Sequence, residues 1–427
     1  MKILIINYTD GGGGGAIAPL RLYKGLKAKG VDVDFAVIEK QSEDDAIFCI
    51  SRKRTFFVKV HQKLARYFER FLFKHFKTKN GVLHSLNLYT RADVNFINRS
   101  DYDVVHLHWI AGNTLSIRDI GKITKPLCWT MHDSWAVCGA EHHPKNKNDK
   151  RYIKGYTKKN RPKWEQGFDI NKWIFNKRKK FYTQPIQFIG PSKWQSQICN
   201  DSFIFKHLAH STVSHIPNIL NAECFHPLDK AMAKSIFGID INKKVLMFST
   251  PYFGDPTTDM KGSGLLIDAL NVFFNTHSVD DFILLMTGNI SGEIKKRLPN
   301  VQTVFTGFIQ NPHLMNLAYN AADVLLFPSR IENLPYGLLE PHAAGIPCVA
   351  FDTGGNSDIV QHKKTGYLAP CFDTNDFAQG INYCLENAAE LSHNATEHIR
   401  KNFNADDVIN AHIALYEKII ASESRCE

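Results

Sequence analysis

The chain has 427 residues, which is too long for one ordinary hydrophobic core and predicts two domains of about 150–200 residues each. Apolar residues make up 44% and charged residues 22%, which is typical of a soluble globular protein, and the net charge of +10 favours anionic partners without choosing among nucleotides, lipids and nucleic acid. The nine cysteines form no CxxC pair and are odd in number, which argues against a disulfide framework and suits the reducing cytoplasm.

Short, nearly continuous apolar runs alternate with amphipathic stretches along the chain, and such runs predict parallel strands covered on both faces. The first half contains Ile3–Ile6, Val33–Ile38, Val104–His108, Leu127–Met131 and Phe188–Gly190. The second half contains Val245–Ser249, Phe282–Thr287, Val301–Thr306, Val324–Pro328 and Pro347–Phe351. Strand, turn and helix in repeated alternation predict an α/β chain with two doubly wound, Rossmann-like parallel-sheet domains.

A run of glycines follows the first strand directly and precedes a helix that we expect to begin near Ala16. Glycines let backbone N–H groups approach a ligand, and a helix N-terminus attracts phosphate. The spacing Gly11-x-Gly13-x-x-Ala16, with Glu39 ending the next strand, also fits a dinucleotide fingerprint, so NAD binding stays open beside phosphate contact and a plain flexible turn. The candidates for an acceptor or phosphate loop are Gly13, Gly14 and Gly15.

Residues 52–79 predict a basic amphipathic helix, because apolar side chains recur every three or four positions and lysines and arginines fill the other face. Such a helix can lie on an anionic membrane surface, or its aromatic stripe can pack on the first domain. The N-terminal MKILIINY enters its strand too early for a signal peptide, and no apolar run approaches the roughly 20 residues of a transmembrane helix. We therefore expect a cytoplasmic protein whose membrane contact, if any, is peripheral.

The stretch from Val104 to Pro144 is rich in possible metal ligands. These are His106, His108, His132, Asp133, Cys138, His142 and His143. Their spacing lacks the tight pairs of zinc sites, and a core role suits the first two histidines better. His132 and Asp133 follow a predicted strand at its carboxyl end, where open α/β sheets bind ligands, so His132 is a candidate functional residue.

The segment His215–Pro227 separates the two series of strands, because it carries two prolines and turn-forming asparagines. We therefore expect an N-terminal domain over residues 1–215 and a C-terminal domain over residues 216–405. A final helix, about 406–424, is expected to pack back on the first domain.

Two carboxylates mark the second half. A buried strand, Val324–Pro328, leads into a polar loop with Glu332, and a helix expected to begin near Pro335 carries Glu340. A loop carboxylate at this edge of a sheet can accept hydrogen bonds from sugar hydroxyls, and a helix carboxylate can accept both vicinal hydroxyls of a ribose. For two carboxylates alone, however, ordinary solvated acids are the default interpretation.

Residues 301–370 resemble the donor-binding half of the retaining GT-B glycosyltransferases of glycosyltransferase family 4. The mark of that family is E-x7-E, here Glu332 to Glu340, within ENLPYGLLEPHAAGIPCVAFDTGG. The flanking ADVLLFPS, TGGNSDIV and KKTGYLA match as well. Weaker matches are IPNILNAECFHP between the domains, MKGSGLLIDAL around Lys261 and TMHDSW around His132, so that the resemblance covers most of residues 1–30 and 100–420.

The resemblance implies a GT-B fold, in which two Rossmann-like domains face an interdomain cleft, with an N-terminal acceptor-binding and a C-terminal donor-binding domain. It implies a hexosyltransferase that takes a sugar from a UDP- or GDP-sugar with retention of configuration and without a metal or other cofactor. Lys261 would neutralise the leaving diphosphate, Glu340 would bind the ribose, and Glu332 and His132 would contact the transferred sugar. The further donor-binding residues implied are Ser329, Asn333, Leu334, Pro335 and Leu338.

The sequence departs from the family in three places. An arginine usually stands about five residues before the lysine, whereas residues 252–256 read YFGDP; Lys193 and Arg330 are candidate substitutes. Asn333-Leu334 replaces a frequent Phe-Gly, a variant familiar from bacterial polysaccharide enzymes. Residues 145–180 match little and are candidates for shaping the choice of acceptor.

The resemblance and the basic helix together suggest a lipid-linked saccharide acceptor in bacterial capsule, exopolysaccharide or lipopolysaccharide assembly, and no nucleic-acid partner. Three alternatives stay open: a nucleotide-sugar epimerase, a dehydrogenase, and a non-catalytic protein of the same fold. The epimerase lacks a recognisable acid–base set, and the dehydrogenase leaves residues 301–370 unexplained. The missing arginine is the one observation that favours the non-catalytic protein.

Overall fold

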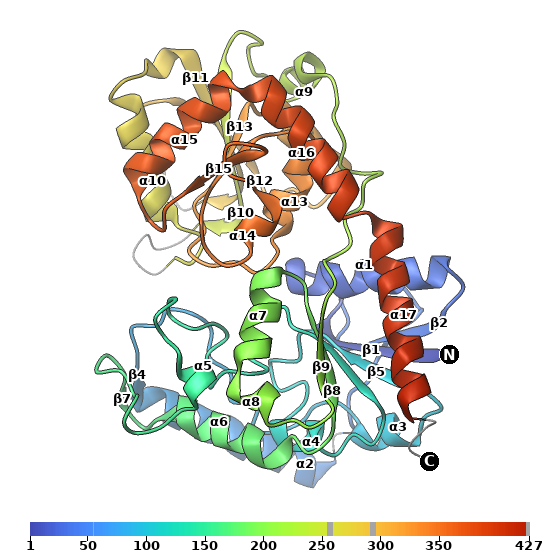
Figure 1. Cartoon of the computed structure of the whole chain (residues 1–427). Coiled ribbons are helices and arrows are strands. Elements are labelled where there is room, and N and C mark those ends of the chain that lie inside the picture. The colour runs from blue at the N-terminus through green and yellow to red at the C-terminus, as the bar shows by residue number, and fades with distance from the viewer. Residues whose placement is uncertain (54, 254–258, 291–295, 424–427) are drawn as a thin grey trace. The chain divides into compact units, whose positions relative to one another are not determined.

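The fold is given by a computed structural model, which describes residues 1–53, 55–253, 259–290 and 296–423 (Figure 1). Arg54 of the predicted basic helix, and residues 254–256 of the segment without an arginine, lie outside the described residues. The chain divides into two compact units. Unit 1 comprises Met1–Asn218 and the residues from Asp406 onward, and unit 2 comprises Ile219–Ala405.

Unit 1 is built on a seven-stranded sheet in the order β3-β2-β1-β5-β6-β8-β9, with every neighbouring pair parallel. Its strands are β1 (Lys2–Thr9), β2 (Asp32–Glu39), β3 (Ile47–Cys49), β5 (Val104–Leu107), β6 (Leu127–Thr130), β8 (Ile186–Gly190) and β9 (Thr212–His215). The five strands predicted in the first half are confirmed. The two edge strands escaped prediction because they are short and partly polar. Two further short strands, β4 (Phe76–Lys77) and β7 (Gln166–Gly167), form a separate antiparallel pair.

The helices of unit 1 are α1 (Gly14–Ala28), α2 (Phe56–Lys74), α3 (Val94–Arg99), α4 (Ile117–Ile120), α5 (Arg151–Lys154), α6 (Ile170–Phe181), α7 (Lys193–Asp201), α8 (Phe203–Lys206) and α17 (Ala405–Glu423). Helix α1 begins two residues before the predicted Ala16, because the amides of Ala16 and Ile17 both donate to the carbonyl oxygen of Gly13. Gly14 and Gly15 thus belong to the helix. The interpretation in which the aromatic stripe of α2 packs on the first domain is wrong, because most of that stripe is exposed.

Unit 2 is built on a six-stranded sheet in the order β12-β11-β10-β13-β14-β15, again parallel throughout. Its strands are β10 (Lys244–Phe253), β11 (Phe282–Ile290), β12 (Gln302–Gly307), β13 (Val324–Phe327), β14 (Cys348–Phe351) and β15 (Gly366–Ala369). Its helices are α9 (Lys230–Ile236), α10 (Ser263–Phe274), α12 (Pro312–Ala321), α13 (Tyr336–Ala343), α14 (Asn356–Ile359), α15 (Thr374–Glu386) and α16 (Ala388–Asn402), with a 3-10 turn at Val279–Asp281. The prediction of two doubly wound parallel-sheet domains is confirmed.

Helix α17 belongs to unit 1, although the chain reaches it from unit 2. Its Tyr416 hydroxyl lies 2.7 Å from Nδ1 of His106 on β5, and its Asp406 forms an ion pair of 2.6 Å with Lys29. Tyr416 is fully buried, so the contact is part of the core of unit 1 and not a surface association.

Candidate active-site residues

In unit 2 the predicted donor-side residues collect at one edge of the sheet. Strands β10, β13 and β14 are neighbours, and because they are parallel their carboxyl ends share that edge. The turn that follows β10 carries Lys261, and the loop that follows β13 carries Glu332. The turn that follows β14 supports this loop, since the amide of Gly355 donates to the carbonyl oxygen of Glu332 over 2.9 Å.

Lys261 and Glu332 form an ion pair across this edge, with 2.6 Å between Nζ and Oε1. The charge of Glu332 raises the pKa of the Lys261 ammonium above its usual value, so the lysine is charged at neutral pH. Asp259, which sequence reasoning did not single out, fixes the turn because its carboxylate accepts from the amides of Lys261 and Ser263. The result is a preorganised cation beside a carboxylate, at the edge where such sheets bind ligands.

Two glycines make this packing possible. Gly262 has a φ of 77°, and a Cβ there would lie 2.0 Å from the carbonyl oxygen of Pro328. Gly354 has a φ of 58°, and a Cβ there would lie 1.9 Å from the carbonyl oxygen of Glu332. The Glu332 loop is therefore held between two turns that only glycine allows.

Glu340 lies in the second turn of α13 and is buried. The hydroxyl of Tyr319 on α12 approaches its Oε2 at 3.4 Å, a contact that sequence reasoning missed because Tyr319 lies outside the E-x7-E motif. Helix α13 begins after Pro335 without a side chain that caps its N-terminus, so its dipole favours an anion at this end. A buried carboxylate one turn from such a helix end can bind a ligand's hydroxyl groups.

The other predicted donor-side residues lie around the same loop and helix. Ser329, Asn333 and Leu334 are buried, and Leu338 is fully buried in the core with its amide bonded to the carbonyl oxygen of Pro335. Arg330, one proposed substitute for the missing arginine, places its guanidinium 5.2 Å from the ring centre of Phe372. The other substitute, Lys193, begins α7 in unit 1.

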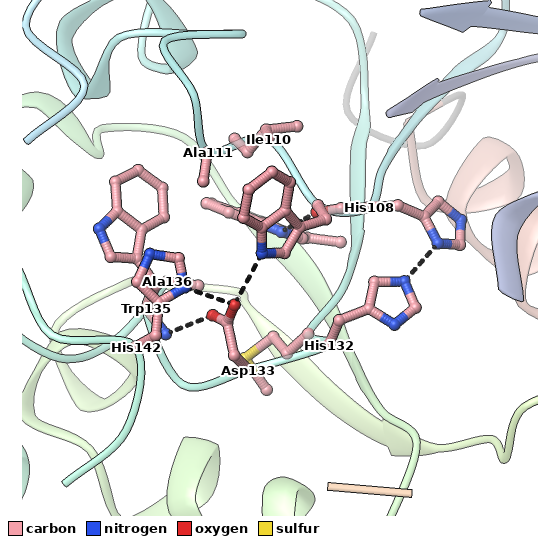
Figure 2. A pocket seen from close by; sticks show the side chains of 11 residues that line it. His108, Ile110, Ala111, His132, Asp133, Trp135, Ala136 and His142 are labelled. Atoms are coloured by element: carbon pink, nitrogen blue, oxygen red, sulfur yellow. Dashed lines mark hydrogen bonds and ion pairs between the residues drawn. The ribbon is translucent and has the colours of Figure 1, made fainter. Parts of the chain in front are cut away.

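In unit 1, His132 and Asp133 follow β6 and line a small pocket with His108 and His142 (Figure 2). The carboxylate of Asp133 accepts a bond of 2.6 Å from His142 and a bond of 3.0 Å from the Trp109 indole. Burial opposes ionisation of Asp133, but the charge and hydrogen bond of His142 outweigh it and lower the pKa of Asp133 to about 2. Asp133 is therefore an anion that holds the pocket wall in place.

A column of histidines connects His132 with the C-terminal helix. Nε2 of His132 lies 2.9 Å from Nδ1 of His108 (Figure 2), and the ring of His108 contacts that of His106 at a tilt of 40°, with 4.2 Å between ring centres. His106 in turn bonds Thr130 and Tyr416. Burial lowers the pKa of His132 to about 4 and the pKa values of His106 and His108 well below the ordinary value, so all three rings are neutral at pH 7. His106 and His108, for which a core role was expected, hold the ring of His132 in position.

The buried histidines predict that unit 1 loses stability as the pH falls from 7.5 to 5.5. Among the described residues, burial lowers the pKa of five histidines of unit 1, and it also lowers that of His342 in unit 2, to about 3. The five are His84, His106, His108, His132 and His412. Because burial lowers the pKa of each histidine in the folded state, the unfolded chain binds more protons than the folded chain below about pH 6.5. Each histidine then lowers the free energy of unfolding by about 1.4 kcal/mol for every pH unit of further acidification.

Tryptophan fluorescence measures this effect selectively, because all six tryptophans lie within residues 109–194 of unit 1. We expect the Tm of that signal to fall by about 10 °C or more. Glu141 opposes the loss in part, because burial raises its pKa to about 7 and the folded state gains a proton there. An unchanged Tm between pH 7.5 and 5.5 would contradict the neutral-histidine core.

The glycine loop of unit 1 is shaped by contacts of its own. The carboxylate of Asp10 accepts from the amides of Gln41 and Ser42, and the Asn7 side chain donates to the carbonyl oxygen of Gly15 over 3.0 Å. Glu39, the acidic residue that the dinucleotide interpretation needs, forms an ion pair of 2.8 Å with Arg91. A ribose would have to compete with this pair, which weakens the NAD interpretation.

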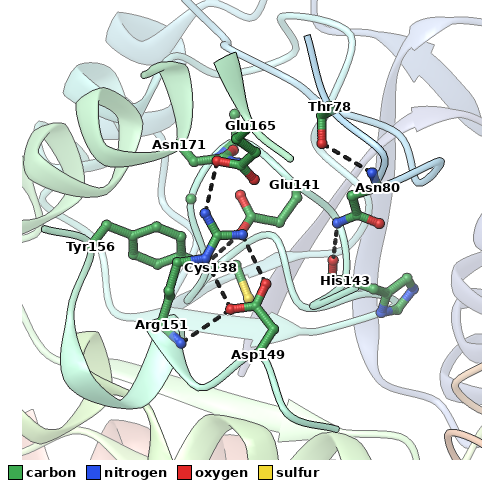
Figure 3. A network of polar contacts seen from close by, with 12 residues as sticks. Thr78, Asn80, Cys138, Glu141, His143, Asp149, Arg151, Tyr156, Glu165 and Asn171 are labelled. Atoms are coloured by element: carbon green, nitrogen blue, oxygen red, sulfur yellow. Dashed lines mark hydrogen bonds and ion pairs between the residues drawn. The ribbon is translucent and has the colours of Figure 1, made fainter. Parts of the chain in front are cut away.

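A buried ion-pair network holds residues 141–171 together (Figure 3). Nη1 of Arg151 lies 2.9 Å from Glu165, and Nη2 lies 2.8 Å from Asp149 and 3.6 Å from Glu141. The Tyr156 hydroxyl donates to Glu141 over 2.6 Å. The backbone amide of His142, the residue after Glu141, donates to the carbonyl oxygen of Leu83. Because His142 also lines the Asp133 pocket, the network holds the segment next to that pocket.

Two classes of site find no support in the part of the chain that the structure describes. Among those residues, no group of three or more histidine, cysteine, aspartate or glutamate side chains is arranged to hold a metal ion. The same residues contain no helix that is both long and apolar enough to span a bilayer.

Comparison with known sequences matches residues 257–402 to the family described as Glycosyl transferases group 1. An uncharacterized glycosyltransferase of Methanocaldococcus jannaschii is 25% identical over 202 residues, which are 44% of this chain and 48% of that protein. N-acetyl-alpha-D-glucosaminyl L-malate synthase of Bacillus anthracis is 22% identical over 222 residues, 49% of this chain and 55% of that protein. The chain thus spans about half the length of these curated relatives.

Comparison with solved structures covers nearly the whole chain. The Anabaena protein HepE, whose crystal structure is a complex with UDP and glucose, superposes with a TM-score of 0.64 over 98% of this chain and 99% of its own, at 15% identity. At this identity the likeness concerns the fold alone. The two parallel-sheet units have the fold of GT-B glycosyltransferases.

Proposed function

We propose that the chain is a glycosyltransferase that moves a sugar from a nucleotide-diphosphate sugar to a saccharide acceptor with retention of configuration. The observation that carries the proposal is the Lys261–Glu332 ion pair at the carboxyl edge of the unit 2 sheet, with buried Glu340 on the adjoining helix. It lies within residues 257–402, which match the Glycosyl transferases group 1 family.

In this proposal each group has one task. Lys261 neutralises the charge that develops on the leaving phosphate as the bond between the anomeric carbon and the phosphate oxygen breaks. Glu332 exchanges its bond to the lysine for the sugar's hydroxyls, and Glu340 accepts the hydroxyls of the ribose. The uncapped start of α13 adds its dipole, so the diphosphate is stabilised without a metal ion. No other cofactor takes part.

On the acceptor side, His132 contacts the sugar near the reacting centre as a neutral imidazole, and Gly13, Gly14 and Gly15 lie beside the acceptor or the phosphates. We propose a lipid-linked saccharide acceptor in bacterial capsule, exopolysaccharide or lipopolysaccharide assembly, met at the inner face of the cytoplasmic membrane. Contact between residues 52–79 and an anionic membrane would bring the enzyme to such an acceptor.

Calorimetric titration with UDP, GDP, ADP and dTDP tests the donor site. We expect one nucleotide to bind, and Glu340→Ala to weaken that binding by about 10–100-fold, because a charge-assisted pair of hydrogen bonds is lost. Glu340→Gln keeps the volume and one acceptor oxygen and should lose less. Binding of none of the four nucleotides would favour a non-catalytic protein of the same fold. In a separate incubation with the matching nucleotide sugar, its conversion to the epimer with the sugar still attached would favour the epimerase.

A further inference from the structure

Helix α2 differs from an ordinary surface helix because its apolar face is exposed and its more polar face lies against unit 1. The side chains that face unit 1 are Val58, Gln62, Ala65, Glu69 and Leu72, at the three-and-four spacing of one helix face, and only Leu72 is buried. Glu69 bonds the amide of Leu88 and the side chain of Asn113, so polar contacts hold much of this face to unit 1. The helix is thus attached with Leu72 as its one buried side chain, and its aromatic side chains stay exposed.

Those apolar side chains form a stripe on the outward face. Phe57 is 82% exposed, Phe56 is 75% exposed and Leu64 is 63% exposed. The stripe continues through Val60, Tyr67, Phe68 and Phe71, all of them exposed. A monomeric soluble protein rarely leaves so many aromatic side chains in contact with water on one helix, and such a patch marks an interaction surface.

A basic stripe runs alongside the apolar one. Its members recur every three or four residues and are all exposed; they are Lys59, Lys63, Arg66, Arg70 and Lys74. The one acidic residue of α2 is Glu69, which faces unit 1. The outward surface of the helix therefore carries positive charge without any acidic side chain from α2 to offset it.

A second basic feature is a groove beside α2, which the helix lines with Phe57, Val58, His61 and Gln62 and not with its basic stripe. It lies between α2, the segment around Thr90, the start of α4 and the end of α6. Its cationic members are Arg52, Arg118, Lys122, Lys177 and Lys180. Asp119 is its acidic member and is engaged by Lys122 over 2.6 Å. The positive charge of the groove therefore exceeds its negative charge, so the groove favours an anionic ligand.

We propose that unit 1 docks on an anionic lipid bilayer through α2, which lies in the plane of the membrane surface. The apolar stripe enters the boundary between headgroups and acyl chains, and the basic stripe and groove bind headgroup phosphates. A second copy of the chain fits this surface poorly, because a symmetric interface would press the same basic residues against one another. The docking does not depend on the transfer reaction.

Co-sedimentation of the full chain with vesicles tests the proposal. We expect binding to vesicles of phosphatidylglycerol and phosphatidylcholine that weakens with salt, and little binding to phosphatidylcholine alone. The triple variant Phe56→Ser, Phe57→Ser, Leu64→Ser should reduce the partition coefficient by about tenfold or more. Its matched control substitutes exposed apolar side chains of unit 2, Met232→Ser, Ile236→Ser and Ile241→Ser, and should bind as the parent does.

Two further double variants test how much the basic stripe and the basic groove contribute to vesicle binding. Lys59→Gln with Lys63→Gln, or Lys177→Gln with Lys180→Gln, should reduce binding to the anionic vesicles by about tenfold, whereas Lys24→Gln with Lys27→Gln on α1 should not. The tryptophan fluorescence Tm checks that each unit 1 variant is folded, and circular dichroism checks the unit 2 control, because all six tryptophans lie in unit 1. Three outcomes would overturn the proposal: equal binding to both kinds of vesicle, equal losses in the controls, or a lipid-free dimer that the serine variant dissociates.

Discussion

Replacing Lys261 by alanine is expected to lower kcat/KM for the nucleotide-sugar donor by about 10³-fold, the upper range for removing one preorganised donor from a transition state. The effect is expected mainly in kcat, because the charge on the leaving phosphate grows as the sugar–phosphate bond breaks and is greatest in the transition state. The raised pKa of Lys261 means that the whole population carries the charge at neutral pH. Release of free nucleotide from the donor that titration identifies measures the rate.

A matched control exists in the same unit. Lys230 pairs with Asp323 over 2.9 Å and is 41% exposed, and Lys261 pairs with Glu332 over 2.6 Å and is 42% exposed. Asp323 precedes β13, so this second pair lies at the amino end of the strand, away from the candidate site. Lys230→Ala should therefore leave the rate within about twofold of the parent, and the buried Asp323 keeps its ion pair of 3.4 Å with Lys234.

Lys261→Arg separates charge from geometry. A guanidinium keeps the positive charge but presents a planar fork on a different stem, so an intermediate rate is expected. Equal rates for Lys261→Ala and Lys230→Ala would contradict the role assigned to the site. A loss confined to KM would reduce Lys261 to a residue that only binds the donor.

The sequence predicted the parallel strands because burial on both faces leaves a continuous apolar run. Val324–Phe327 and Cys348–Phe351 are buried at every position, and both were predicted to within one residue at each end. Ile47–Cys49 has no such run, because only its first residue is buried. Helix α1 began earlier than predicted because Gly13 offers a backbone carbonyl oxygen as the first acceptor, which no side-chain pattern reveals.

The candidate site was predictable only in part. Glu332 and Glu340 share one motif, whereas Lys261 lies 71 positions from Glu332 and meets it because β10 and β13 are neighbours in the sheet. The order of strands in a sheet does not follow from local sequence patterns. Lys261 and Glu332 were therefore assigned to one site by the family resemblance and not by the residue pattern. The final helix was expected to pack back on the first domain, but nothing in the sequence paired His106 with Tyr416, which lies 310 positions away.

The ion-pair network of residues 141–171 could not be predicted from the sequence either, because no sequence pattern distinguishes a buried arginine from an exposed one. Arg151 reads as one more basic residue in a stretch rich in lysine, yet its side chain is 4% exposed and touches three carboxylates. The segment was expected to shape acceptor choice. Its contacts give it a structural task that can be measured separately.

Arg151→Met is expected to lower the free energy of unfolding of unit 1 by about 3–5 kcal/mol, because the buried carboxylates of Glu141 and Glu165 lose their cation. Methionine fills much of the volume of the arginine stem, so the loss reports charge more than packing. Arg400→Met removes an exposed pair with Glu397 and should cost less than about 1 kcal/mol. Denaturant unfolding followed by tryptophan fluorescence measures Arg151→Met, and circular dichroism measures Arg400→Met.

The pH dependence distinguishes lost charge from lost packing. Burial already raises the pKa of Glu141 to about 7 in the presence of Arg151, and removal of the cation raises it further. Protonation then relieves the unpaired charge, so the difference between Arg151→Met and the parent should be smaller at pH 6 than at pH 8. Adding Glu141→Gln should recover part of the loss at pH 8 for the same reason. A difference independent of pH, with no recovery in the double variant, would mean that Arg151 stabilises unit 1 by packing alone.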